Sequence, residues 1–133
     1  MNLNPYFLIP EATLKEAFNT IENTYGHLAI ILDKNNKLIG LVTDGDIRRL
    51  ILKVQKPIAA LFVDDVKVYC TKIYASITPD TSLKSAILLM EELNIWDLPV
   101  VDNANNLKGL LLLVRLNKFD YISFELTLHH NFS

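Results

Sequence analysis

The sequence predicts an α+β fold (α/β by some schemes) in which one supersecondary unit is used twice. Residues 79–110 repeat residues 10–41 at a constant offset of 69, with 10 identities in 32 ungapped pairs. In each copy an amphipathic stripe precedes two short apolar runs that are joined by a five-residue polar turn. Units of about 60 residues bury little surface alone, so the two copies are expected to share a core.

Each copy is expected to open with a short strand, residues 7–9 and 76–78, that leads into a helix. Proline and small hydroxyl residues just before each helix favour helix initiation there and can cap the helix N-terminus. Apolar residues at i, i+3, i+4 and i+7 then predict one buried stripe per helix. These residues are Leu14, Ala17, Phe18 and Ile21 in the first copy and Leu83, Ala86, Ile87 and Met90 in the second.

Two apolar runs in each copy predict antiparallel hairpins. Residues 28–32 and 98–101 are continuous apolar stretches of the kind found in buried strands. Polar, asparagine-rich turns connect them to the second strands, residues 38–43 and 107–114.

A helix over residues 46–53 closes the first copy, and the plan helix-strand-strand-helix is expected in both. Residues 55–76 have mixed periodicity. Alternation in the tail fits an edge strand, and a frayed end is equally compatible. The chain is therefore divided into a first repeat (3–54), a connecting segment (55–75), a second repeat (76–118) and a C-terminal tail (119–133).

Composition excludes several classes of function. A net charge of -2 and a pI near 5.9 give no general attraction to nucleic acid or anionic lipid. No secretion signal or bilayer-length apolar run is present, so a cytoplasmic protein is expected. The single cysteine, Cys70, cannot form an intrachain disulfide and is expected to be a small buried hydrophobe. Half the residues are hydrophobic, which suggests an oligomer surface or a partner.

The segment Gly-Leu-Val-Thr-Asp-Gly-Asp-Ile-Arg-Arg at 40–49 carries the candidate chemistry, where a buried strand turns into a helix. Free N–H groups at a helix start suit a phosphate, and Gly45 keeps the turn clear of a side chain. Thr43 offers a hydroxyl, and the Asp46 carboxylate matches the vicinal diol of a ribose. Arg48, with its neighbour Arg49, could face a phosphate.

Purely structural roles could also explain these residues. Thr43 and Asp46 have the spacing of a capping box, and paired arginines are common on solvated helix faces. Asp44 and Asp46 form a D-x-D pair, which is a weak metal site without a third ligand. In the second copy Leu112 and Arg115 stand at the Thr43 and Asp46 positions. A cap needed only for folding would be expected twice, so we interpret the difference as evidence for binding in the first copy.

Two further residues have alternative interpretations. Trp96 could stack on a base or could lie in a core or a subunit interface, and His27 takes the equivalent position in the first copy. A lone histidine without acidic or cysteine neighbours is usually structural. No nucleophile, base and orienting group converge in the sequence, so an enzyme is not expected.

The doubled unit, the strand Leu98-Pro99-Val100-Val101-Asp102 and the pattern Gly40-x-x-Thr43-x-x-Asp46 together resemble a tandem cystathionine-β-synthase-type (CBS) domain pair, or Bateman module. The resemblance covers residues 3–116. The longer string at 40–49 is similar to CBS pairs fused in front of sugar nucleotidyltransferase domains, and to those behind sugar-phosphate isomerase domains.

This resemblance implies two repeats packed by pseudo-twofold symmetry around two clefts, a homodimer, and a ligand such as AMP, ADP, ATP or S-adenosylmethionine. It assigns the ribose to Asp46 and a hydroxyl contact to Thr43, beside Asp44, Gly45 and Arg48. The base pocket that it implies consists of Ile9, Pro10, His27, Leu28 and Ala29. Ile30 stands where the family pattern has the proline found at Pro99.

Three functional hypotheses follow. The first is a non-catalytic regulatory or sensor module that binds an adenine nucleotide and modulates a partner enzyme, with sugar-nucleotide metabolism as the implied setting. The second is a nucleotide-silent dimerisation or docking domain. The third is an enzyme fragment that uses Asp44 and Asp46 with Mg²⁺ on a sugar nucleotide.

Overall fold

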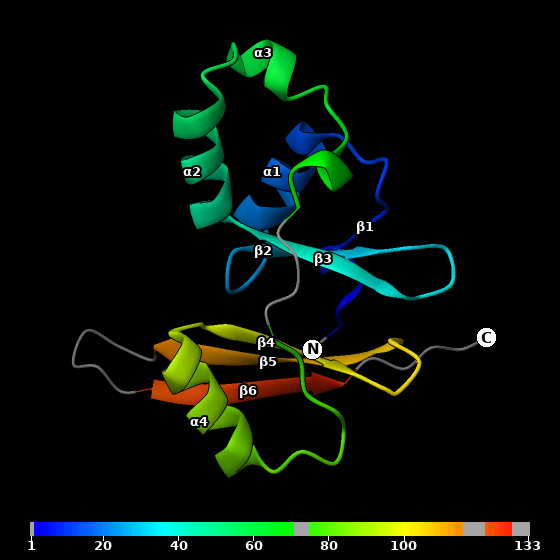
Figure 1. Ribbon diagram of the computed structural model, residues 1–133, viewed down its shortest axis with the longest axis vertical. Helices are drawn as coiled ribbons and strands as arrows, with labels where there is room; N and C mark the ends of the chain where they lie inside the picture. The colour runs from blue at the N-terminus through cyan, green and yellow to red at the C-terminus, as the bar shows by residue number, and fades with distance from the viewer. Residues whose placement is uncertain (1, 71–74, 116–121, 129–133) are drawn as a thin grey trace. The chain divides into compact units, whose positions relative to one another are not determined.

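The computed structural model shows two compact units, residues 4–73 and residues 74–133 with 1–3 (Figure 1). The structure describes residues 2–70, 75–115 and 122–128. The first unit combines several helices, and the second one described helix, with a small three-stranded sheet, as expected for the α+β class. No helix among the described residues has both the length and the apolar composition needed to cross a bilayer.

The first unit contains a mixed sheet in the order β1-β2-β3. Strand β1 runs parallel to β2, and β2 and β3 form the expected antiparallel hairpin. Its elements are the 3-10 helix η1 (Asn4–Tyr6), β1 (Phe7–Leu8), α1 (Leu14–Glu22), β2 (Leu28–Leu32), β3 (Leu38–Thr43), α2 (Asp44–Val54), α3 (Ile58–Leu61) and the 3-10 helix η2 (Val66–Val68).

The core of the first unit lies between this sheet and its helices. Figure 1 shows α1 and α2 on the same side of the sheet. All five residues of β2 are buried, as a continuous apolar strand requires. The apolar stripe of α1 contributes Leu14, Ala17 and Ile21 to the core, and α2 contributes Ile47.

The segment after α2, which the sequence left without a clear interpretation, is an integral part of the first unit. Leu61 and Val66 are buried in its core. The amide of Leu14 donates to the carbonyl of Asp64 at 2.9 Å, and Thr13 and Asp65 form an antiparallel bridge. The segment therefore covers the N-terminal end of α1.

The second unit repeats the hairpin and the first helix. Its sheet has the order β4-β5-β6, and Ile77 forms a parallel bridge with Val100, in agreement with the expected leading strand. The apolar side of α4 packs on Leu98 and Leu111. The elements are α4 (Leu83–Leu93), β4 (Asp97–Val101), β5 (Leu107–Arg115) and β6 (Ile122–Leu128).

The two units match in detail at the sequence offset. Leu28 pairs with Thr43 in the first hairpin, and Asp97 pairs with Leu112 at the equivalent positions of the second. The register shifts fall at equivalent places, between Ile31 and Leu32 and between Val100 and Val101. The repeat in the sequence is thus also a repeat of backbone structure, and even the register shift within each hairpin is reproduced.

The last element of the second unit differs from the expected plan. A helix was expected after β5, but β5 runs on to Arg115, and the next described element is the strand β6, antiparallel to β5. Alternating apolar residues from Ile122 to Leu128 favour a strand, and Leu112 offers no cap to start a helix. The interpretation of the tail as an edge strand is confirmed, because β6 ends the sheet.

Candidate functional site

Thr43 and Asp46 form a complete capping box at the corner between β3 and α2. The Thr43 hydroxyl accepts a hydrogen bond from the Asp46 amide at 3.1 Å, and the Asp46 Oδ2 accepts one from the Thr43 amide at 3.0 Å. Thr43 has an extended backbone, as an N-cap residue requires. This reciprocal pair explains why α2 begins at Asp44, two residues earlier than the sequence pattern predicted.

The second oxygen of Asp46 is also bound. Its Oδ1 accepts from Nη2 of Arg49 at 2.8 Å. The Asp46 side chain is 19% exposed and that of Arg49 is 71% exposed. The carboxylate is therefore held in place, whereas the guanidinium that neutralises it is free to move into solvent.

Asp44, Gly45 and Arg48 complete the first turn of α2. Asp44 Oδ1 accepts from the Gly45 amide at 2.9 Å, and its Oδ2 lies 3.6 Å from Nη1 of Arg48. A Cβ at Gly45 would lie 3.2 Å from Nη1 of Arg49 and 3.7 Å from Nη2 of Arg48. Both guanidinium groups thus fold back over this glycine, whose missing side chain leaves them room.

The charges of the corner balance within one turn and a half of helix. Two carboxylates and two guanidinium groups surround a helix N-terminus that itself favours negative charge. Among the described residues no three histidine, cysteine or acidic side chains are grouped so that they could hold a metal ion. The two carboxylates and two guanidinium groups of the corner therefore balance each other within the described structure.

Three of the expected pocket residues lie next to the corner. The His27 carbonyl accepts from the Asp44 amide at 3.3 Å, and Leu28 is the register partner of Thr43. The side chains of Leu28 and Ala29 are fully buried, so they are closed to a ligand in this conformation. The exposed His27 has a left-handed backbone (φ 53°), and its Nδ1 lies 3.2 Å from the Ile21 carbonyl oxygen.

The other two expected pocket residues lie farther from the corner. Ile9 and Pro10 follow β1, which is separated from β3 by β2. Ile9 is exposed, and the carbonyl of Pro10 accepts from the Lys67 amide at 3.1 Å. Within the first unit Pro10 is thus hydrogen-bonded to the segment that covers α1, whereas the Ile9 carbonyl accepts from the Ala12 amide at 3.0 Å.

The comparison with the second copy does not support binding in the way that the sequence suggested. At the equivalent positions Leu112 lies within β5 and Arg115 is its last residue. The second copy therefore lacks the cap because no helix starts there. Helix capping alone accounts for the difference between Thr43 and Leu112, so that difference gives no evidence about a ligand.

The structure also shows how exposed Trp96 and Cys70 are. The side chain of Trp96 is half exposed, so it is not a core residue of the second unit. Cys70 is half-buried and not fully buried as expected, and burial raises the pKa of its thiol, which lowers its reactivity without closing it to solvent.

A polar cluster that the sequence did not reveal holds the connecting segment together. Asp64 Oδ2 accepts from Nζ of Lys56 at 2.8 Å and from the hydroxyl of Tyr69 at 2.6 Å. Lys56, and then Tyr69, lower the pKa of the Asp64 carboxyl by donating these bonds. Its members are 5 to 13 residues apart in an irregular segment, so no periodic signal could have indicated them.

Comparison with known proteins decides the family. The model of the CBS domain matches residues 1–53 and 63–119. The chain belongs to the CBS-domain family, as a tandem pair. The doubled fold described above is therefore that of two CBS repeats.

Two of the similar proteins are enzymes with different activities. The chain is 29% identical to inosine-5'-monophosphate dehydrogenase of Halalkalibacterium halodurans over 86% of its own length and 22% of the enzyme's. It is 30% identical to arabinose 5-phosphate isomerase KdsD of Francisella tularensis over 68% of its length and 26% of the enzyme's. The chain thus spans about a quarter of these relatives, and neither is a sugar nucleotidyltransferase.

A similar solved structure contains a nucleotide. CBSX2 in complex with AMP is 27% identical, with a TM-score of 0.67 over 80% of this chain and 79% of CBSX2. The AMP belongs to the structure of that protein, and the likeness extends over about four fifths of both chains.

Proposed function

We propose that this CBS pair is a non-catalytic regulatory module that binds an adenine nucleotide, with AMP as the first candidate, at the corner between β3 and α2. In this proposal the Asp46 carboxylate accepts the ribose hydroxyls, and Thr43 donates or accepts a further hydrogen bond. Arg48 and Arg49 contact the phosphate, while Asp44 and Gly45 line the first turn of α2. The exposed His27 lies on the side of the base. Leu28 and Ala29, whose side chains are buried, take part only through their backbone, and Ile9 and Pro10 form the outer edge of the base pocket.

The observation that carries the proposal is the arrangement of the Asp46 carboxylate. It is fixed by the Thr43 amide through one oxygen, and its other oxygen is paired with a mostly exposed guanidinium. An exposed ion pair contributes little to stability, about 1 kcal/mol or less, so a ligand can replace it at small cost. The likeness to CBSX2, whose structure contains AMP, supports an adenine nucleotide as the ligand.

Ligand binding at this corner would change its electrostatics. Arg49 would leave Asp46 for the phosphate, and the diol would take its place on Oδ1. A nucleotide that favours one arrangement of the chain over another in this way shifts the equilibrium between them, which is the physical basis of regulation.

A partner enzyme is part of the proposal. The likeness to the arabinose 5-phosphate isomerase favours a sugar-phosphate isomerase over a sugar nucleotidyltransferase, and the dehydrogenase relative adds purine nucleotide metabolism. A homodimer is proposed as the regulated state.

A second candidate function is a nucleotide-silent docking domain. It is favoured by the complete capping box, in which Thr43 and both oxygens of Asp46 already have partners. In that case the corner serves only to start α2.

Titration calorimetry of the full chain with AMP, ATP and S-adenosylmethionine separates the two candidates. We expect saturable binding of at least one nucleotide and a loss of about ten- to a hundredfold in affinity for Asp46→Asn, because a charged acceptor is lost. The side-chain amide that Asp46→Asn introduces still offers an oxygen to the backbone amide of Thr43, so the capping geometry is kept.

A cap variant in the second unit is the matched control. Ser82 accepts from the Ser85 amide at 3.1 Å at the start of α4, and Ser82→Ala removes that cap. It should lower stability by about 1 kcal/mol and leave nucleotide affinity unchanged. Absence of heat with all three nucleotides would instead establish the silent domain.

A further inference from the structure

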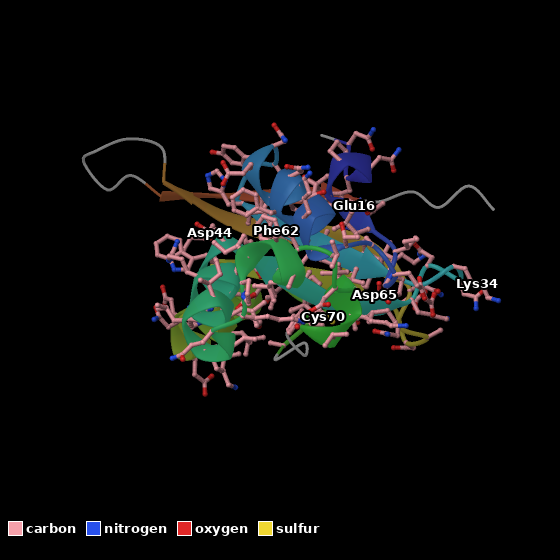
Figure 2. The ribbon with its side chains drawn as sticks, turned by 90° about the horizontal axis from the view of Figure 1, so that it is seen from above. Glu16, Lys34, Asp44, Phe62, Asp65 and Cys70 are labelled. Atoms are coloured by element: carbon pink, nitrogen blue, oxygen red, sulfur yellow. The ribbon has the colours of Figure 1, made fainter. Side chains whose placement is uncertain are left out.

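The backbone amides at the start of α2 already have hydrogen-bond partners. The Asp44 amide donates to the His27 carbonyl at 3.3 Å, and the Gly45 amide donates to Asp44 Oδ1 at 2.9 Å. The Asp46 amide donates to the Thr43 hydroxyl at 3.1 Å. Asp44, the first residue of α2, is labelled in Figure 2. None of these three amides is free for a phosphate, contrary to the expectation from the sequence, so a phosphate here would depend on side-chain donors.

Two guanidinium groups are the side-chain donors of this corner. Those of Arg48 and Arg49 are 72% and 71% exposed, and each is paired with a carboxylate of the same turn. The pair of Arg48 with Asp44 is loose, with 3.6 Å between Nη1 and Oδ2. The pair of Arg49 with Asp46 is a hydrogen-bonded contact of 2.8 Å. Of the two pairs, the second occupies an oxygen of the carboxylate that is proposed to hold the ribose.

The pair of Arg49 with Asp46 has different consequences for ligands with and without a phosphate. Oδ2 of Asp46 is held by the Thr43 amide at 3.0 Å, so a ribose diol competes with Arg49 for Oδ1. A nucleotide offers the displaced guanidinium a phosphate, which accepts charge-assisted and often bidentate hydrogen bonds. A nucleoside offers nothing in exchange, so the ion pair is lost without compensation when it binds.

We propose that the ion pair of Arg49 with Asp46 is an autoinhibitory contact that makes the corner selective for nucleotides over nucleosides. The proposal rests on the nucleotide site proposed above and adds to it the residue that determines specificity. Arg49 opposes every ligand that contacts Oδ1 of Asp46, and it favours a ligand only when a phosphate draws the guanidinium away. Gly45 leaves room for the inhibitory position, because a Cβ there would lie 3.2 Å from Nη1 and 3.4 Å from Nη2 of Arg49.

Adenosine and AMP are the matched probes, since they differ only in the phosphate. Titration calorimetry of the full chain with each ligand gives the ratio of the two dissociation constants. Arg49→Met removes the guanidinium and keeps a long side chain with a high helix propensity. In this variant the Asp46 carboxylate keeps its bond to the Thr43 amide and therefore stays in place.

The affinities for the two ligands are expected to change in opposite directions. Arg49→Met should tighten adenosine binding about twofold to fivefold, because an exposed ion pair no longer competes for Asp46. The same variant should weaken AMP binding about tenfold or more, because a charge-assisted contact to the phosphate is lost. The preference for AMP over adenosine should thus fall about twentyfold or more.

Two further variants separate this role from a general effect of charge. Arg48→Met removes the guanidinium that is paired with Asp44 and not with Asp46, so it should weaken AMP binding without a gain for adenosine. Lys53→Met removes one positive charge from the last turn of α2, and should leave both affinities within about twofold.

Different results would overturn this proposal and the proposed function. If Arg49→Met brings no gain for adenosine while AMP binding still depends on Asp46, the ion pair is not inhibitory, and the proposed function stands. An equal gain for adenosine in Arg48→Met or Lys53→Met would also overturn the autoinhibitory role, because the effect would then be one of net charge. Absence of binding of both ligands to the wild type and to every variant would overturn the proposed function, and the autoinhibitory role with it.

Discussion

The two units of this chain share a leading strand, a helix and a hairpin whose register agrees residue by residue, and they differ in the elements that follow the hairpin. Strand register, the irregularity in each hairpin, and the leading strand are reproduced at the offset of 69 residues. The first unit adds a second helix and a covering segment, whereas the second adds the strand β6. The shared part specifies the fold, and the accessory elements determine which surfaces each half leaves open.

Leu14 and Leu83 show the consequence most directly. They are equivalent in sequence and in position on their helices, yet one is fully buried and the other is 54% exposed. A residue's environment in an internal repeat thus depends on the elements added outside the repeat.

Truncating these two leucines should give the largest difference between the units. Leu14→Ala removes a fully buried side chain and should lower the free energy of unfolding by about 2–5 kcal/mol. Leu83→Ala should change it by about 0.5 kcal/mol or less, as a surface substitution does. Urea denaturation followed by circular dichroism measures both, and similar losses would show that Leu83 is covered in solution.

Removing the turn carboxylates should show where the units are alike. Asp33 Oδ1 accepts from the amides of Asn35 and Lys37 at 2.8 and 3.0 Å, and Asp102 Oδ1 accepts from those of Ala104 and Asn106, both at 2.9 Å.

Asp33→Ala and Asp102→Ala should each cost about 1–2 kcal/mol, with the larger loss for Asp102, because Nδ2 of Asn106 also donates to it. Lys34→Ala, at an exposed position of the first turn, is the control. A loss in only one unit would mean that the hairpins are not equivalent in solution.

Glycine substitutions at the two helix C-termini should change stability by less than the substitutions above, and by different amounts in the two units. The residues after α2 and α4, Gln55 and Asn94, both have left-handed backbones with φ of 53°. Gln55→Gly should stabilise the chain by about 0.5–1 kcal/mol, because glutamine is strained there. Asn94→Gly should have a smaller effect, since asparagine tolerates this conformation, and thermal unfolding compares the two.

The Asp64 cluster should give the smallest effect, visible as a dependence of stability on pH. Lys56 and Tyr69 lower the pKa of Asp64 in the folded state. Its contribution is therefore present above the pKa of the unfolded chain, near 4, and is lost as the pH falls through the lower folded value.

Asp64→Asn should lower the melting temperature at pH 7, and this difference from the wild type should shrink at a pH low enough to protonate the wild-type carboxyl in the folded state. Asp65→Asn is a control on the neighbouring residue. An equal effect of Asp64→Asn at both pH values would assign its role to packing instead of charge.

The shared half of the fold could be predicted from the sequence because its signals are local. Apolar runs, asparagine-rich turns and helical stripes each lie within about ten residues. The runs, the turns and both helices were found, but Phe18 and Leu83 of the two stripes are exposed and not buried as predicted. The covering segment could not be predicted, since Leu61 and Val66 are buried by contacts with Leu14, about 50 residues earlier in the chain.

The absence of the expected helix among the described residues that follow β5 has a different cause. The internal repeat predicted a helix after β5, while the local alternation of residues 122–128 predicted a strand, and the local pattern was correct. At the site, the spacing of Thr43 and Asp46 predicted both a cap and a ligand contact. The cap is confirmed, and the ligand contact stays a prediction because a carboxylate can serve either purpose.

Cys70 and Trp96 are the single cysteine and the single tryptophan of the chain, and they lie in different units. A thiol-reactive dye on Cys70 would sit beside the covering segment of the first unit, while the intrinsic fluorescence of the half-exposed Trp96 reports the second. The efficiency of energy transfer from the indole to the dye would report changes in the distance between the two units. The natural sequence thus already contains a donor and an attachment point with which any ligand-driven rearrangement can be observed.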